Sequence, residues 1–201
     1  MNVYDFDKTI YPGDSATHFW RFCVSRHPAA LASLPGAAVI LLRSLGKPGI
    51  HGALKQQIYG FLRRIPDVES EVNAFWDAHI GDIYPWYIDR KRPDDLVISA
   101  SPFFLVGEAC RRLGIECMAT DMDPATGQIR GTNCRREEKV RRYREIYGNI
   151  PVEEFYSDSY ADRPMMELAE SAFLMKNGAV AACVKACPAL LEGVTGNESA
   201  Q

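Results

Sequence analysis

The sequence lacks a closely spaced Cys-x-x-Cys pair, although its 201 residues include six cysteines. Structural zinc sites are usually built from such pairs, so we do not expect one here. The cysteines are scattered, which favours reduced and mostly buried thiols. Cys183 and Cys187 lie four residues apart and could face the same way on a helix, which leaves a redox pair as the alternative.

The sequence also has little excess charge of either sign. Its 23 basic and 26 acidic residues give a net charge of -3 at pH 7, so no global basic field indicates nucleic-acid binding. The chain does not begin with a basic leader and an apolar run, so we expect a cytoplasmic protein. Residues 37–42 form an apolar run that is too short to cross a bilayer, so stable membrane insertion is not expected. That run could lie at a membrane interface, but a buried helix is the favoured interpretation.

Alternating strand and helix patterns predict an α/β fold. Hydrophobic residues make up 47% of the chain, as in ordinary globular proteins, and the length suits one domain or one core with an insertion. Short apolar runs predict strands at residues 3–6, 96–99, 115–119, 154–156 and 172–175. Helical patterns at residues 103–113, 136–147 and 164–169 separate the later strands. This alternation is typical of a parallel sheet wound with helices.

The segment between the first two strands is predicted to be entirely helical. Its first helix begins after Asp14 or Ser15, either of which can cap a helix, and Pro28 breaks it. Further helices are predicted at residues 29–34, 36–45, 52–64 and 68–83. We therefore expect an α/β core of residues 1–14 and 89–201, with residues 15–88 inserted as a helical subdomain.

Two acids directly follow the first predicted strand. Asp5 and Asp7 are separated by Phe6, and carboxylates two residues apart on an extended chain can reach the same site. Such a pair suits a nucleophile combined with an acid or base. A solvated loop is the alternative for these acids taken alone.

Further polar residues occur at matching places along the chain. Ser99 ends a predicted strand, Lys139 lies near the start of a predicted helix, and Asp158 and Asp162 follow another strand. Each has a plain alternative: a local backbone hydrogen bond for the serine, solvation for the lysine, and capping of the helix near Pro164 for the acids. The two acid pairs and the serine all fall at the ends of predicted strands, and only the lysine does not. The crevice of a parallel sheet lies at those strand ends, and this favours one shared site.

Four short segments carry a resemblance to a known family. Residues 5–9 read Asp-Phe-Asp-Lys-Thr, residues 97–101 read Val-Ile-Ser-Ala-Ser, residues 133–139 end in a lysine, and residues 156–164 hold two acids. These segments resemble the four motifs of the haloacid dehalogenase superfamily of phosphohydrolases. The helical insertion after the first motif resembles the cap of its phosphoserine-phosphatase-like subfamily, subfamily IB.

The resemblance implies a Rossmann-like core with an inserted helical cap, and a magnesium-dependent phosphatase. Asp5 would attack phosphorus and form an aspartyl-phosphate, and Asp7 would protonate the leaving oxygen and then activate water. The Asp5 carboxylate, the Asp7 main-chain carbonyl and the Asp158 carboxylate would bind Mg²⁺. Asp5 would need to be ionised, whereas Asp7 would need a raised pKa.

The same resemblance implies how the phosphate is held. Ser99, Ala100 and Lys139 would bind the transferring phosphoryl group, and Asp162 would support the metal site or orient the lysine. Because haloalkanoate dehalogenases of the superfamily lack the second acid, Asp7 favours phosphate esters over carbon–halogen bonds.

The predicted substrate is a phosphate monoester of a small metabolite. Asp14 falls where phosphoserine phosphatases carry a glutamate, but the fourth motif lacks their usual glycines and asparagine, so phosphoserine itself is not indicated. Aromatic residues are frequent in the insertion, and core packing is the favoured interpretation. An apolar pocket for a lipid phosphate, as in phosphatidylglycerophosphatase relatives, is one alternative. A phosphotransferase or mutase using the same intermediate is another.

Two further interpretations concern a group of basic residues and the possibility that the domain binds a ligand without catalysis. Five basic residues could lie at the rim of a cleft, although solvated charge is favoured. They are Arg63, Arg64, Arg90, Lys91 and Arg92. A binding domain that has lost catalysis is the remaining alternative, and the presence of all the motif residues argues against it.

Overall fold

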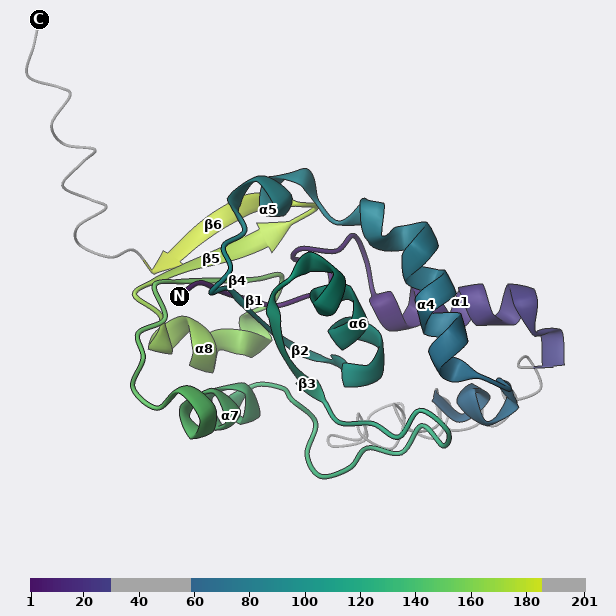
Figure 1. The fold of residues 1–201 in the computed structure, drawn as a ribbon. Coiled ribbons are helices and arrows are strands. Elements are labelled where there is room, and N and C mark those ends of the chain that lie inside the picture. The colour runs from purple at the N-terminus through teal and green to yellow at the C-terminus, as the bar shows by residue number, and fades with distance from the viewer. Residues whose placement is uncertain (30–58, 186–201) are drawn as a thin grey trace, which may run out of the picture.

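A mostly parallel sheet forms the centre of the computed structural model, which describes residues 1–29 and 59–185 (Figure 1). The predicted helix at residues 36–45, most of those at 29–34 and 52–64, the apolar run and Cys187 lie outside the described residues. Within them, the strand order is β3-β2-β1-β4-β5-β6, and all neighbours pair in parallel except β5 and β6. The strands are β1 (Val3–Tyr4), β2 (Leu96–Pro102), β3 (Glu116–Thr120), β4 (Glu154–Ser157), β5 (Ser171–Lys176) and β6 (Ala179–Lys185). The predicted α/β fold class is confirmed.

Successive strand residues bury opposite faces of this sheet, as the two-residue period of a strand requires. Tyr4, Val97 and Tyr156 belong to one buried apolar cluster, together with residues of α6 and of the insertion. Their neighbours Val3 and Phe155 belong to a second cluster, together with residues of α7 and α8. Both faces are therefore covered, which explains why the parallel strands read as continuous apolar runs.

Helices link the strands and cover the two faces. The helix α6 (Phe103–Leu113) packs on β2 and β3, and it ends at Gly114, whose φ of 69° is the left-handed conformation that favours glycine. On the other face, α7 (Glu137–Tyr147) contacts α8 (Arg163–Leu168), which follows the short 3-10 helix η4 (Tyr160–Asp162). The predicted helix at residues 103–113 is confirmed at both ends.

The described part of the insertion between β1 and β2 consists of helices joined by short loops. It contains α1 (Ser15–Arg26), η2 (Tyr59–Arg64), α4 (Val68–His79), η3 (Ile80–Asp82) and α5 (Pro85–Arg90). Asp14 caps α1 by accepting a hydrogen bond from the Thr17 N–H at 2.7 Å, and Asp67 caps α4 in the same way.

Most aromatic side chains of the insertion pack against the core. Phe19, Phe61, Phe75 and Trp76 are fully buried in the apolar cluster that also holds α6 side chains. The Trp76 indole N–H donates a hydrogen bond of 2.8 Å to the Leu105 carbonyl of α6, which ties α4 to the core. The insertion and the core therefore share one apolar interior.

The structure differs from the sequence-based expectations in one additional strand and in the position of one cysteine. The strand β6 was not predicted, and it pairs antiparallel with β5 through a turn at Asn177 and Gly178, both with positive φ. Cys183 lies within β6, so the suggestion that it faces Cys187 from a helix is wrong. Its strand places Cys183 at an edge that is mostly exposed.

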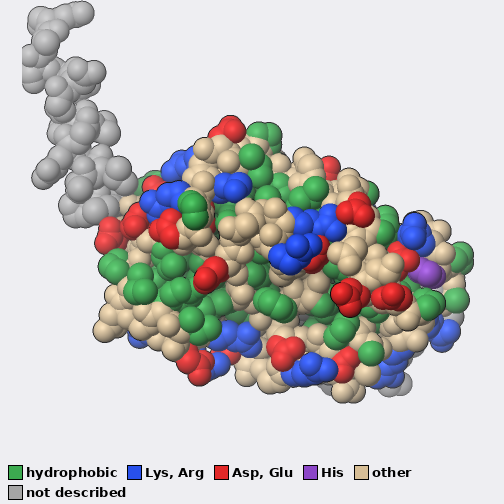
Figure 2. Space-filling model, viewed as in Figure 1, with side chains coloured by type: hydrophobic (Ala, Val, Ile, Leu, Met, Phe, Trp, Pro, Cys, Tyr) green, Lys and Arg blue, Asp and Glu red, His purple; other side chains and the backbone are tan. Residues whose placement is uncertain are grey.

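The described surface carries mixed charge and no spanning helix. Basic and acidic side chains are interspersed on the face shown in Figure 2, in keeping with the small net charge. In the part of the chain that the structure describes, no helix is long and apolar enough to cross a membrane.

Candidate active site

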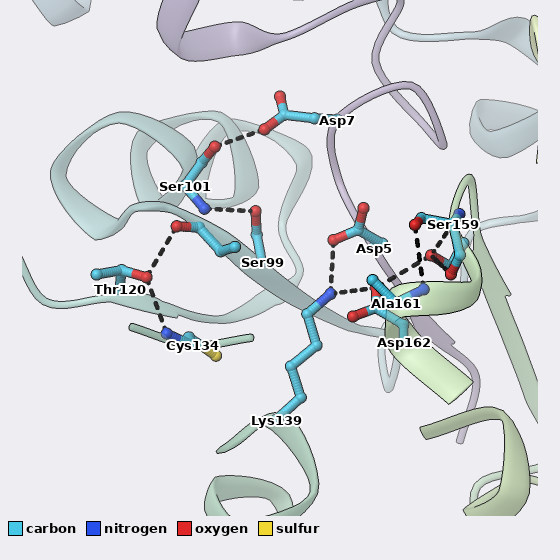
Figure 3. Close-up of polar contacts among 12 residues, drawn as sticks. Asp5, Asp7, Ser99, Ser101, Thr120, Cys134, Lys139, Ser159, Ala161 and Asp162 are labelled. Carbon is cyan, nitrogen blue, oxygen red and sulfur yellow. Dashed lines mark hydrogen bonds and ion pairs between the residues drawn. The ribbon is translucent and has the colours of Figure 1, made fainter. Parts of the chain in front are cut away.

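A cavity of about 280 Å³ lies where β1, β2 and β4 end. It collects side chains from segments that are far apart in the sequence, and Figure 3 shows several of them pointing toward one another. The lining residues are Asp5, Asp7, Lys8, Asp14, Ala16, Tyr59, Ser99, Ala100, Ser101, Arg135, Lys139, Asp158, Ser159, Ala161 and Asp162. Every residue predicted for the site therefore borders this one cavity.

A tight turn after β1 places the first two acids. The Asp5 N–H donates a hydrogen bond of 2.8 Å to the Tyr156 carbonyl, which continues the β1–β4 pairing by one residue. Phe6 is fully buried in the apolar core, and its carbonyl accepts from the N–H groups of the next turn. Lys8 completes the turn with a φ of 58°. Because Phe6 points into the core, its two neighbours point toward the cavity, as expected.

Lys139 is the buried cation of the site. Its ammonium donates hydrogen bonds of 2.7 Å to Asp5 Oδ1 and 2.7 Å to Asp162 Oδ2 (Figure 3). Its side chain is 1% exposed, so the sequence-based alternative of a solvated lysine is wrong. Burial lowers the pKa of Lys139, but the two carboxylates outweigh it and raise the pKa above its usual value. The lysine is therefore charged and fixed.

Burial works against the ionised form of Asp5 that was expected from the sequence. Desolvation is the main cause that raises its pKa to about 7, and the nearby charges of Asp162 and Asp7 add to the rise. Lys139 opposes this shift through its charge and its hydrogen bond. Only Oδ1 of Asp5 receives a hydrogen bond from described residues, so the second oxygen is available to a ligand.

Asp7 is held by the start of α1 and by β2. Its Oδ1 accepts a hydrogen bond of 2.7 Å from the Ser15 N–H, and its Oδ2 accepts one of 2.5 Å from the Ser101 hydroxyl. Burial raises the pKa of Asp7, and the charge of Asp14 raises it further. This is the direction expected for a carboxyl group that must carry a proton near neutral pH.

The end of β2 supplies two serines rather than one. Ser99 is 1% exposed, and its Oγ accepts a hydrogen bond of 3.1 Å from the Ser101 N–H, so the local backbone bond considered for it does form. Thr120 Oγ1 lies 2.8 Å from the Ala100 carbonyl and 3.0 Å from the Cys134 N–H. The end of β2 is thereby linked to the loop that leads to Lys139.

The acids after β4 have different surroundings. Asp162 is 5% exposed, and besides Lys139 its Oδ2 accepts a hydrogen bond of 3.0 Å from the Ser157 hydroxyl. Asp162 precedes α8 but makes no side-chain capping bond, so helix capping does not explain it. Asp158 is half-buried, and burial raises its pKa while the charge of Lys8 lowers it.

Sequence reasoning missed three residues of the cavity. Ser101 stands two positions after Ser99, and this spacing was an available signal because it places both on one side of a strand. Tyr59 is the cavity-lining aromatic of the described insertion; it is 2% exposed, and burial raises its pKa well above the usual value. Arg135 gave no signal beyond its closeness to Lys139.

Two of the five basic residues proposed for a cleft rim lie away from the cavity. Arg90 and Arg92 form ion pairs of 3.1 Å and 3.0 Å with Glu154 and Glu153 at the start of β4, the opposite end from the cavity. They are partly exposed, as the solvated interpretation expected. The rim interpretation is therefore wrong for these two residues.

The donor chemistry of the cavity suits a hard divalent cation. Asp5 and Asp158 offer carboxylate oxygens, and such oxygens together with main-chain carbonyls are the ligands that Mg²⁺ takes. Among the described residues no group of three or more His, Cys, Asp or Glu side chains is arranged to hold a metal. The predicted set needs only two side chains and one main-chain carbonyl, so the residues fit such an ion without a larger cluster.

A comparison with protein families shows the family of the chain. Residues 3–167 match the family described as haloacid dehalogenase-like hydrolase. Protein CicA of Caulobacter vibrioides is 28% identical over 190 residues, which cover 84% of this chain and 82% of that protein.

Solved structures share the fold. A protein with unknown function from Bordetella pertussis superposes with a TM-score of 0.73 at 22% identity, covering 97% of this chain and 94% of the other. A phosphoserine phosphohydrolase-like protein from Francisella tularensis superposes with a TM-score of 0.56 at 14% identity, covering 87% of each chain.

Proposed function

The chain belongs to the haloacid dehalogenase-like hydrolases, and from that premise we propose that it hydrolyses phosphate monoesters of small metabolites through an aspartyl-phosphate on Asp5. One observation carries the proposal. Asp5, Asp7, Ser99, Lys139 and Asp158 come from distant segments and border one small cavity. Acids, a hydroxyl and a buried cation in one place are the groups that phosphoryl transfer needs.

The first step transfers the phosphoryl group to Asp5. The carboxylate oxygen that Lys139 does not hold attacks phosphorus, and the bond from phosphorus to the ester oxygen breaks. Asp7, whose pKa is raised by burial, is proposed to carry a proton at this stage and to give it to the departing oxygen. The products of this step are an alcohol, the acyl phosphate of Asp5 and the Asp7 carboxylate.

The second step returns the enzyme to its starting state. The Asp7 carboxylate takes a proton from a water molecule, whose oxygen attacks phosphorus as the bond to Asp5 breaks. Inorganic phosphate leaves, and Asp7 is again protonated. The hydrogen bonds that Asp7 accepts from Ser15 and Ser101 support this role, because they hold the carboxyl group in one orientation for both proton transfers.

Lys139, Ser99 and Ala100 are proposed to hold the transferring group. The charge of Lys139 is already shared between Asp5 and Asp162, so the lysine alone leaves an excess of negative charge in the cavity. A phosphate dianion would be repelled by that excess. Ser99 adds a hydroxyl donor at the end of β2, and its side chain is buried and therefore fixed.

Mg²⁺ would balance the remaining charge. The Asp5 and Asp158 carboxylates and the Asp7 main-chain carbonyl would hold it, and Asp162 would support the site through its hydrogen bond to Lys139. When bound, the ion supplies electrostatic stabilisation of the transferring phosphoryl oxygens. Residues 15–88 are proposed to act as a cap over this site, because Ala16 and Tyr59 of the insertion line the cavity.

The substitution Asp5→Asn tests the nucleophile. We expect loss of at least about 1,000-fold in the hydrolysis of p-nitrophenyl phosphate with Mg²⁺ present, because an amide cannot form the acyl phosphate. Asp89→Asn, at an exposed position of α5, is the matched control and is expected to keep wild-type activity. Near-normal turnover by Asp5→Asn would remove Asp5 as the nucleophile.

Removal of the metal tests the second part of the proposal. We expect chelation with EDTA to suppress hydrolysis and added Mg²⁺ to restore it. Hydrolysis that is insensitive to the chelator would contradict the metal assignment while leaving the phosphatase proposal in place.

A further inference from the structure

Arg135 brings a further positive charge to the cavity. It borders the same 280 Å³ space as Asp5 and Lys139, and it is half-buried. Among the described residues, no carboxylate pairs with its guanidinium. The arginines that follow on α7 behave differently, because Arg141 and Arg142 both form ion pairs with Glu138. The Arg135 side chain is therefore available to a ligand.

The backbone around Arg135 is fixed in place. The preceding residue, Cys134, is fully buried, and its N–H donates a hydrogen bond of 3.0 Å to Thr120 Oγ1. The Arg135 N–H donates one of 2.8 Å to the Asn133 carbonyl. A side chain that leaves a rigid loop loses little backbone entropy when it binds a ligand, which favours a built binding group over a chance surface charge.

The other cations of the cavity have partners. Lys139 is bonded to Asp5 and Asp162. Lys8 lies close enough to Asp158 for their opposite charges to interact. Of the three cations among the described lining residues, Lys139 alone is in hydrogen-bond contact with acids. Lys8 interacts with Asp158 through charge only, and Arg135 forms no ion pair with a described carboxylate.

We propose that Arg135 binds a second anionic group, a carboxylate or a further phosphate, on the leaving portion of the substrate. The planar guanidinium offers two parallel N–H donors, which match the oxygens of either group. The inference rests on the proposed phosphatase function and makes it narrower. Preferred substrates are then phosphate monoesters with a nearby second negative charge.

The experiment compares esters that differ only in this group. The full chain with Mg²⁺ is assayed by phosphate release on ethyl phosphate, phosphoglycolate and ethylene glycol bisphosphate. We expect a higher kcat/KM for one or both of the anionic esters than for ethyl phosphate, and the two arms tell a carboxylate from a phosphate. In Arg135→Gln this preference falls by about 10- to 100-fold, the effect of one charged hydrogen-bonded pair.

Two further variants separate recognition from loss of structure. Arg135→Lys keeps the charge and is expected to retain part of the preference. Arg144→Gln removes an exposed arginine from the last turn of α7, outside the cavity, and is expected to keep the preference unchanged. Equal loss for all three esters in Arg135→Gln would overturn the inference, because Arg135 would then act on the transferring phosphate or on folding. So would a wild type that does not prefer either anionic ester.

Ligand binding to the Asp5→Asn variant distinguishes failure of the Arg135 inference from failure of the phosphatase proposal. Calorimetry with ethyl phosphate and phosphoglycolate measures affinity without turnover. If wild type hydrolyses no ester but Asp5→Asn binds phosphoglycolate more tightly in an Arg135-dependent way, the phosphatase proposal fails and the anion-binding role stands. If the binding preference is absent as well, both fail.

Discussion

Arg136, the residue before α7, holds a backbone conformation that only glycine adopts readily. Its φ is 55° and its ψ is -124°, a region in which the Cβ of an L-residue is strained. The geometry follows from its neighbours. The Arg136 carbonyl accepts a hydrogen bond of 3.1 Å from the Lys139 N–H, while the Lys139 side chain is drawn into the cavity by its two carboxylates. Those buried bonds hold the strained turn in place.

We therefore predict that Arg136→Gly stabilises the protein. Strain of this kind costs about 1–3 kcal/mol, and glycine costs about 0.5–1 kcal/mol in chain entropy, so about 1 kcal/mol remains in favour of the variant. The Arg136 side chain is exposed and forms no ion pair with any described residue, so its removal alone should matter little. For a chain of this length the gain corresponds to a rise of about 2–4 °C in Tm.

The assay is urea and thermal unfolding of three variants beside wild type. Arg136→Ala removes the same side chain but keeps a Cβ, so its stability should stay close to wild type. Arg144→Gly, in the last turn of α7, should lose up to about 1 kcal/mol because ordinary helical positions disfavour glycine. If Arg136→Gly is no more stable than Arg136→Ala, the backbone at this turn is not strained and the reasoning is refuted.

Two further predictions concern buried and paired charges. Lys139→Met should abolish phosphatase activity and destabilise the chain by about 3–5 kcal/mol, because it leaves Asp5 and Asp162 without their cation; adding Asp162→Asn should recover part of the stability and none of the activity. Glu108→Gln should change the acid dependence of stability. Hydrogen bonds from Arg111 lower the pKa of Glu108 to about 2, so its ion pairs stabilise the fold above about pH 4 and are lost as the pH falls toward 2. Urea unfolding at several pH values should show wild type and Glu108→Gln converging at low pH, and a constant difference would contradict this.

Most core elements could be predicted from the sequence because they are buried. The apolar run predicted as a strand at residues 96–99 is the first part of β2, which continues to Pro102. The helix before Gly114 has an apolar pattern and a clear termination signal. The strand β6 could not be found in this way, since nearly all of its side chains are exposed and no alternation marks a buried face. Its one signal was the Asn177–Gly178 pair, a dipeptide typical of tight hairpin turns.

The residues of the candidate site also differ in how well they could be predicted from the sequence. Asp5 and Asp7 were predictable because short-range spacing and a recognisable motif carry them. Ser101 and Arg135 were not singled out, because their place in the cavity depends on how segments distant in sequence come together. Ser101 bonds to an acid 94 positions away, and no local pattern encodes that distance. The roles of all these residues in catalysis stay predictions until the variants are measured.

The strand order explains why the motif residues converge. From β1 the chain adds β2 and then β3 on one side, and it returns to place β4 on the other side of β1. At such a reversal the connections leave the sheet in opposite directions, which opens a crevice beyond the carboxyl end of the central strand. Asp5 follows β1 at that point, and the ends of β2 and β4 flank it with Ser99 and Asp158. A chain with the same motifs in another strand order would separate the two acids by at least one strand spacing of about 5 Å more, too far to share one small cation. The order of the strands is therefore as much a part of the proposed site as the side chains.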